Sequence, residues 1–182
     1  MGRQTTDRVF TSPFGPIPLA AQHIGHSGAS VPAGPTAACE VDAALIQPLE
    51  DVTCTRNIGG ETQTHRGYYQ PDDAHLENLQ VVKSGAMTGV TRGRICETGV
   101  SLMTRSAHGL INYSFGYWVM HEQDGIPFAL PGDSGSVVVA MDGRLVGLLV
   151  AMQDPMQDPG AAAFVVPIAP ILAALNIGLI GP

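Results

Sequence analysis

The sequence predicts an all-β protein, and three observations carry this prediction. The chain contains 22 Gly and 14 Pro among its 182 residues, so much of it must form turns between short segments. Several runs, such as SVVVA and RLVGLLV, are rich in the aliphatic and β-branched residues that suit strands. Gly or Asp-Gly turns, such as Asp142-Gly143, separate these runs at the spacing of an antiparallel barrel or sandwich.

The first part of the chain offers few strands. Two are expected, over Arg8–Thr11 and Val41–Gln47, and the stretch SGASVPAGPTAA between them is loop-like because its small residues and prolines offer a strand little to pack. Residues 53–78 are polar and predict a connector. Six strands follow from Leu79 to Val166, in the runs LQVVKS, GVTRGRI, LINYSFGYWVM, SVVVAM, RLVGLLV and AFVV.

The end of the chain carries no charged residue from Ala161 onward, over a length that could cross a membrane. Pro167 and Pro170 argue against a span, because each proline would break the hydrogen-bond ladder of a transmembrane helix. A strand followed by a short helix over Ala169–Leu175 accommodates both prolines. We therefore expect no membrane partner.

The charge of the chain and the spacing of its cysteines and histidines argue against nucleic-acid-binding and metal-binding proteins. The net charge is −7 and no basic run exists, so nucleic acid is not an expected partner. Cys39, Cys54 and Cys96 lack the spacing of a zinc site and are expected to be buried. If the protein is exported, two of them can form one disulfide. The six histidines are scattered, so we expect no metal and no cofactor.

The most informative stretch for chemistry is PGDSGS, from Pro131 to Ser136, just before a predicted strand. Glycines on both sides of Ser134 permit a tight turn, in which the amides of Gly132 and Ser134 could point into one pocket as an oxyanion hole. An ordinary hairpin turn rich in Gly, Asp and Ser is the alternative.

Asp42 is the second candidate, because it precedes the apolar run AALI. A carboxylate at the start of a buried strand needs a hydrogen-bond donor, and an imidazole N–H is one such donor. Backbone amides that cap the strand are the alternative.

These residues stand in a familiar context. The run GDSGS, followed by VVVAMDGRLVGLLVAM and FVVPIAPILAALNI, resembles the end of chymotrypsin-like (trypsin-like) serine proteases, and VVKSGAMTGVTRGRI resembles the hairpin that opens their second barrel. The resemblance covers about residues 79–176 and extends more weakly to Asp42. It implies a double Greek-key β-barrel fold with an incomplete first barrel: 1–52 as the remnant of the first barrel, 53–78 as the connector, and 79–182 as the second barrel with its C-terminal helix.

The resemblance also implies roles for individual residues. Ser134 would be the nucleophile, Asp42 the triad aspartate, and Gly132 with Ser134 the oxyanion donors. Asp133 would be the acidic side chain beside the nucleophile, available to pair with a new amino terminus if the protein is activated by cleavage. The walls of the specificity pocket would lie near Phe128 and along Val150, Ala151 and Met152. These positions carry no carboxylate, so they favour an apolar or small side chain at the cleavage site.

The catalytic histidine is the weak point of this interpretation. The chymotrypsin order requires it before Asp42, and Ala21-Gln22-His23-Ile24 is a partial match, but only 19 residues separate His23 from Asp42. DRVFTSP resembles the strand that ordinarily follows the histidine, which would place that residue upstream of Met1. We therefore expect a truncated, weakly active or inactive serine endopeptidase domain acting on polypeptides.

Other interpretations are weaker or remain open. An α/β-hydrolase is excluded, because its histidine follows the nucleophile whereas the last histidine here, His121, precedes Ser134. A subtilisin-like order ranks low, because Ser134 precedes a strand rather than opening a helix. A non-catalytic peptide-binding module on the protease fold stays open, and an unrelated β-barrel with an accidental motif is the least favoured.

Overall fold

A computed structural model describes most of the chain from Arg66 onward and parts of what precedes it. The described residues are 10–12, 15–17, 25–31, 38–39, 41, 43–50, 57–58, 61–64, 66–106, 109–154, 156–158 and 160–179. The strands are β1 (Phe10–Ser12), β2 (Gly15–Ile17), β3 (Gly25–Val31), β4 (Ala38–Cys39), β5 (Ala43–Pro48), β6 (Asn57–Ile58), β7 (Glu61–Thr64), β8 (Gln80–Gly85), β9 (Gly89–Ser106), β10 (Gly109–His121), β11 (Val137–Ala140), β12 (Leu145–Met152) and β13 (Ala163–Pro167), and the helix is α1 (Ile168–Leu175).

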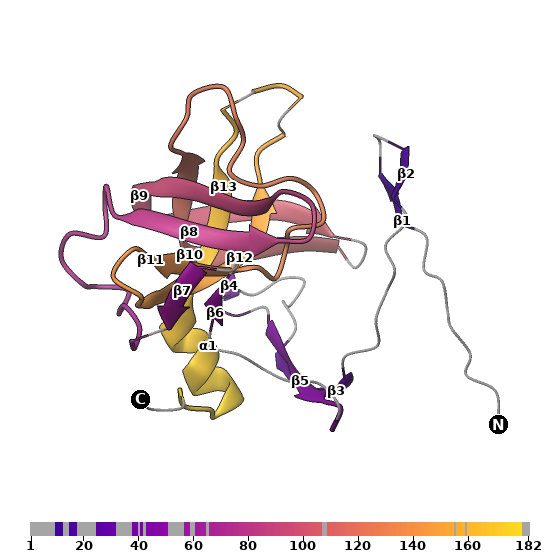
Figure 1. Ribbon diagram of the computed structural model, residues 1–182, viewed down its shortest axis with the longest axis vertical. Coiled ribbons are helices and arrows are strands. Elements are labelled where there is room, and N and C mark those ends of the chain that lie inside the picture. Colours follow the sequence, from indigo (N-terminus) through magenta and orange to yellow (C-terminus); the bar gives the residue numbers. More distant parts are fainter. Residues whose placement is uncertain are drawn as a thin grey trace.

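Six of these strands form a closed antiparallel barrel (Figure 1). β8 pairs with β9 and β9 with β10; β10 then pairs with β13, β13 with β12, β12 with β11, and β11 with β8 again. Closure leaves the paired barrel segments without a free edge. The all-β class with a short C-terminal helix is confirmed.

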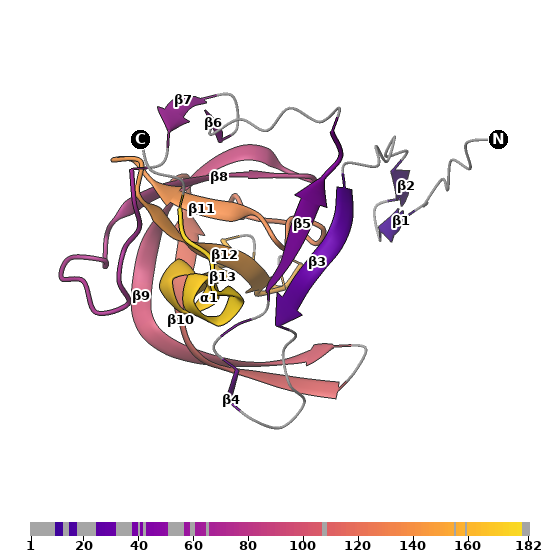
Figure 2. The ribbon, with the colours of Figure 1, turned by 90° about the horizontal axis from the view of Figure 1, so that it is seen from below.

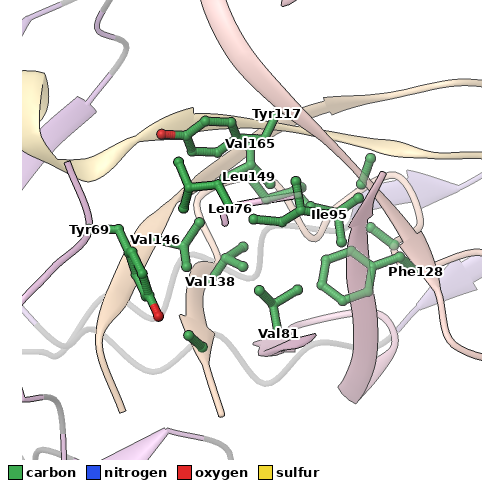
Figure 3. Packing of buried hydrophobic residues seen from close by; sticks show 14 residues of the cluster. Tyr69, Leu76, Val81, Ile95, Tyr117, Phe128, Val138, Val146, Leu149 and Val165 are labelled. Carbon is green, nitrogen blue, oxygen red and sulfur yellow. The ribbon is translucent and has the colours of Figure 1, made fainter. Parts of the chain in front are cut away.

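Neighbouring residues of the barrel strands alternate between two hydrophobic clusters. Val81, Val138 and Val165 belong to the first cluster, which fills the barrel and is shown in Figure 3. Val82, Val139 and Val166, each the next residue along its strand, belong to the second cluster, together with Ile171 and Leu172 of α1. Because both faces of these strands are covered, their sequences are nearly continuous apolar runs instead of alternating ones.

The helix closes over the second cluster and ends in a defined way. It begins after Pro167, one residue before the expected start. Asn176 has a left-handed backbone (φ 50°), and the amides of Asn176 and Ile177 donate to the carbonyls of Ala173 and Leu172. The described part of the chain has no helix long and apolar enough to span a membrane.

The segment before the barrel contains more strand than the sequence predicted. The expected loop SGASVPAGPTAA includes most of β3, which pairs antiparallel with β5 and has a register shift between Ser27 and Ser30. Figure 2 shows these two strands as a ribbon beside the barrel. Here pairing with β5 prevails over the poor strand propensity of Gly, Ser and Ala. This part of the chain also contains the short pairs β1–β2 and β6–β7, and β4, which pairs in parallel with β10.

Two expectations for the later strands were wrong in detail. The run GVTRGRI was expected to be a short strand, but β9 continues for 18 residues. Register shifts relative to β10 at Gly116 and near Trp118 bend this long hairpin. Cys96 was expected to be buried, whereas it is exposed on β9 and unpaired.

Candidate functional site: the loop around Ser134

The loop that carries Ser134 lies between β10 and β11, and its backbone depends on two glycines. Gly132 and Gly135 have φ values of +105° and +90°, a region that L side chains adopt only with strain. The Gly135 amide donates to the carbonyl of Leu149 (2.7 Å), and the Ser136 amide and hydroxyl both donate to the carbonyl of Asp133 (3.0 and 2.5 Å). These bonds fasten the end of the loop to β12 and to itself.

Asp133 fastens the middle of the loop to the β8–β9 turn. Its Oδ1 accepts from the amide of Met87 (2.7 Å) and its Oδ2 from the hydroxyl of Thr88 (2.8 Å) and the amide of Leu130 (3.0 Å). The ammonium of Lys83 lies 3.3 Å from Oδ2, and neither side chain of this ion pair is exposed to solvent. Lys83 also donates to the hydroxyl of Thr88.

Each charge of this buried pair opposes the pKa shift that burial causes in its partner. Burial acts to raise the pKa of Asp133, but the hydrogen bonds from Leu130, Met87 and Thr88, with the charge of Lys83, outweigh it and hold the pKa below its usual value. Burial lowers the pKa of Lys83, and Asp133 opposes that shift. The aspartate is therefore ionised at neutral pH, and its negative charge is paired inside the barrel.

Asp133 already has a cationic partner within the barrel. The resemblance had suggested that this carboxylate could pair with an amino terminus released by cleavage. In this structure Lys83 fills that position, and its ammonium also lies 5.7 Å from the centre of the Phe128 ring. The expectation of an available carboxylate is therefore corrected.

The fit around Asp133 and Gly132 leaves no room for larger residues. A Cβ placed on Gly85 would lie 2.2 Å from Oδ1 of Asp133. A Cβ on Gly132 would lie 2.6 Å from the Cγ of Met87. The β8–β9 turn therefore encloses both the carboxylate and the α-carbon of the residue before it.

This anchoring leaves two amides of the loop without partners. The Asp133 amide donates to the carbonyl of Leu130 (3.0 Å), whereas those of Gly132 and Ser134 have no hydrogen-bond acceptor among the described residues. The exposed Ser134 donates its hydroxyl to the carbonyl of Val150 at 3.4 Å. Chemically, the loop offers a hydroxyl flanked by two N–H donors, an arrangement that can hold an oxyanion beside a nucleophile.

The other predicted site residues are placed only in part. His23 and Asp42 lie outside the described residues, so their roles stay predictions. Val150, Ala151 and Met152 are half-buried at the end of β12, and the carbonyl of Val150 contacts Ser134. Phe128 is fully buried in the barrel core, and its role as a pocket wall stays a prediction. In the described part of the chain, no imidazole is hydrogen-bonded to Ser134.

Lys83 supports the Ser134 loop through Asp133, and the sequence analysis gave it no role. It is the only lysine of the chain and lies two positions after Val81, so on a strand the two side chains point to the same face. A lysine on an interior face needs a buried acid. That signal was present in the sequence, although it did not say which acid.

Comparison with known proteins defines the class of fold. No protein-family model and no curated protein matches this sequence. Solved structures of chymotrypsin-like serine proteases do match the three-dimensional arrangement, so the fold of this chain is chymotrypsin-like.

Three bacterial proteases illustrate the likeness. The chymotrypsin of Cellulomonas bogoriensis is 22% identical with a TM-score of 0.62, and the match covers 87% of this chain and 76% of that one. Protease A of Thermobifida fusca is 22% identical (TM-score 0.59, 79% and 70% covered), and the Nocardiopsis protease is 19% identical (TM-score 0.54, 85% and 78% covered). Identities this low establish the fold alone.

Proposed function

We propose that this chain is a serine endopeptidase domain in which Ser134 attacks a peptide bond. The hydroxyl oxygen would bond to the carbonyl carbon, the amine would leave with a proton, and water would release the acyl group from Ser134. The structural neighbours are named as chymotrypsin and proteases, which supports a polypeptide as the substrate class.

The observation that carries this proposal is the anchored loop with two unbonded amides. Six hydrogen-bond donors and one buried lysine are committed to Asp133, yet the amides of the residues on either side of it have no acceptor among the described residues. Removing one such donor in a serine protease costs about 100-fold to 1,000-fold in rate. A turn that served only to connect β10 and β11 would not need this buried support.

The base is the part of the machinery that limits the expected rate. His23 is the candidate base within the chain, and Asp42 is its proposed partner. Both belong to residues 1–52, the proposed remnant of the first barrel, which residues 53–78 connect to the proposed second barrel at 79–182. A serine hydroxyl without a base in hydrogen-bond reach is a poor nucleophile at neutral pH. Loss of one triad member leaves on the order of 10³-fold to 10⁴-fold catalysis over water. We therefore propose weak activity, or none, for the chain as given.

The substrate would lie along the end of β12. The Ser134 hydroxyl donates to the carbonyl of Val150, and the side chains of Val150, Ala151 and Met152 carry no charge. Phe128 precedes Ser134 by six positions. An apolar or small side chain at the cleavage site follows from this lining.

Labelling with a fluorophosphonate probe tests the proposal. The expected result is slow, covalent labelling that maps to Ser134 by mass spectrometry and disappears in Ser134→Ala. Ser84→Ala, which removes an exposed serine of β8, should label like the parent protein. Loss of labelling in His23→Ala and Asp42→Ala would identify the base and its partner. Labelling that survives Ser134→Ala would contradict the proposal.

The alternative is a non-catalytic peptide-binding module on the same fold. It is favoured by one contact: the Ser134 hydroxyl is bonded to the carbonyl of Val150, and to no imidazole among the described residues. In that case the folded protein would not label, but it would still bind extended peptides, and Ser134→Ala would leave that affinity unchanged.

A further inference from the structure

The segment Leu130-Pro131-Gly132-Asp133, just before Ser134, is a type II β-turn. The Asp133 amide donates to the carbonyl of Leu130 at 3.0 Å, which is the bond that closes a β-turn. Proline at the second position fixes a negative φ there. Gly132 at the third position has a φ of +105°. This combination of signs defines type II.

The turn type decides where the Gly132 amide points. Types I and II are closed by the same hydrogen bond and both accept proline at the second position, but their central peptide planes differ by a rotation of roughly 180°. The N–H between Pro131 and Gly132 therefore lies on opposite faces of the two turns. This N–H is one of the two proposed oxyanion donors, so its direction matters for the site.

The closing bond and the residue types do not settle that direction. Glycine adopts positive and negative φ about equally readily. The Gly132 amide has no acceptor among the described residues that could hold it. A contact on one face of the turn can therefore decide between the two arrangements.

Met87 supplies such a contact. A Cβ placed on Gly132 would lie 2.6 Å from Cγ of Met87 and 3.3 Å from its Sδ, so the thioether covers the face of the α-carbon where other residues carry a side chain. In a type II turn the preceding carbonyl oxygen lies on this same face, which is why the position needs glycine. The N–H of a trans peptide points away from its C=O. The Gly132 N–H therefore lies on the face opposite Met87.

A flipped turn would be unfavourable beside this side chain. In type I the Gly132 N–H would face the thioether, whose sulfur is a weak acceptor. An amide turned toward an apolar side chain loses the hydrogen bonds that water would give it. The carbonyl of Pro131 would instead face the site, where it would repel a developing oxyanion.

The backbone of Met87 is held by the residue that follows Gly132. Its amide donates to Oδ1 of Asp133 at 2.7 Å, and the amide of Thr88 donates to the same oxygen at 3.2 Å. These bonds bring the half-buried Met87 side chain to Gly132 without involving any of its own atoms. The side chain can therefore be replaced while the anchoring of Asp133 is kept.

We propose that Met87 is a positioning residue that keeps the Gly132 amide directed toward the oxyanion formed beside Ser134, an inference that rests on the proposed function. Met87 acts through the turn type of residues 130–133. Its Cγ makes the closest contact with Gly132, so a side chain that retains a carbon at this position should retain the effect.

Three variants of the whole protein test this role. Met87→Ala ends at Cβ and removes the contact, whereas Met87→Leu keeps a Cγ and a similar volume. Both retain the amide that is bonded to Asp133. Met103→Ala is the matched control, because it removes the same atoms from a side chain on β9 that is 66% exposed. Circular dichroism would establish that each variant is folded.

NMR reports the turn type without the need for a reactive serine. In type II the α-proton of Pro131 lies close to the amide proton of Gly132 and gives a strong nuclear Overhauser effect, which is weak in type I. This signal should be strong in the parent protein, Met87→Leu and Met103→Ala, and weakened in Met87→Ala. The amide of Gly135, which is bonded to the carbonyl of Leu149, should keep its chemical shift in every variant.

The rate of fluorophosphonate labelling measures the consequence for Ser134. Met87→Ala should react about tenfold more slowly than the parent protein. This is less than the roughly 100-fold to 1,000-fold expected for complete loss of an oxyanion donor, because the amide still samples the type II turn. Met87→Leu and Met103→Ala should react at the rate of the parent protein.

Failure of this inference is distinguishable from failure of the proposed function. An unchanged Overhauser effect in Met87→Ala, or labelling of this variant as fast as that of the parent protein, would overturn the inference. Labelling of Met87→Leu as slow as that of Met87→Ala would do the same. If the parent protein does not label at all, the proposed function is contradicted, and the Overhauser effect alone decides whether Met87 holds the Gly132 amide.

Discussion

Replacing Lys83 with Met would test the structural basis of the Ser134 loop. The variant keeps a side chain of similar length but leaves the Asp133 carboxylate buried and without its cation. Breaking a buried ion pair in this way costs about 3–5 kcal/mol. For a chain of this size that corresponds to a fall in Tm of roughly 6–20 °C.

Urea unfolding followed by circular dichroism would measure this loss. Arg66→Met removes an exposed cation just before the barrel and should change the free energy of unfolding by no more than about 0.5 kcal/mol. In the double variant Lys83→Met/Asp133→Asn both charges are gone, so it should be more stable than Lys83→Met alone. A loss below about 1 kcal/mol for Lys83→Met, or a double variant no better than the single one, would refute the reasoning.

The pH dependence of the same variant gives a second check with a defined sign. In the parent protein the pKa of Asp133 is held below its unfolded value of roughly 3.9, so its contribution to stability is complete above that pH and is lost as the pH falls through the lower folded pKa. Without Lys83 that folded pKa must rise, because an opposite charge has been removed. The stability difference between Lys83→Met and the parent protein should therefore shrink as the pH falls through the raised folded pKa of the variant toward the lower folded pKa of the parent protein.

Two further substitutions test packing at the Ser134 loop and in the barrel core. Gly85→Ala should destabilise the protein by about 1–3 kcal/mol, because the new Cβ would lie 2.2 Å from the Asp133 carboxylate. Gly160→Ala is the control and should have little effect, because its Cβ would meet nothing closer than 3.5 Å. Thermal unfolding of both variants measures the difference. Tyr117→Phe should raise the free energy of unfolding by up to about 1 kcal/mol, because it removes a buried hydroxyl that has no partner in the described part of the chain. A loss of stability in urea titration would show that this hydroxyl is satisfied.

The barrel was predictable because its strands carry their own signals. Runs such as Val137–Ala140 and Leu145–Met152 are apolar on both faces, and Asp142-Gly143 marks the turn between them. The helix was equally clear, since Pro167 and Pro170 limit where it can begin. These are local patterns of a few residues, which sequence reasoning detects well.

The strand β3 was not predictable in the same way. Its sequence, GHSGASV, contains little that prefers an extended conformation, and the β5 partners lie 12 positions (Val31 with Ala43) to 23 positions (Gly25 with Pro48) further along the chain. Such pairing is decided by the partner strand and not by local propensity. The extension of β9 beyond Cys96 has the same origin, because β10 supplies the partner along most of its length.

The same distinction between local signals and distant pairing applies to the candidate site. The motif around Ser134 singled out the loop of the proposed nucleophile, but the residues that support it lie 45 to 50 positions earlier, in β8 and the turn that follows. No spacing rule connects Lys83 with Asp133. Their contact follows from the pairing of β8 with β11, which brings the end of β8 beside the start of β11.

The support of the Ser134 loop is therefore separable from its activation. Within the part of the chain that the structure describes, the hydrogen bonds and the ion pair of Asp133 and Ser134 are made with residues between Lys83 and Val150, in the barrel or its turns. The proposed base and its aspartate, His23 and Asp42, belong to the part of the chain before it. A protein that fails to react with a fluorophosphonate could thus retain a fully formed loop. Lys83→Met would then still destabilise the fold by the amount given above, because that cost arises from the buried carboxylate and does not depend on catalysis.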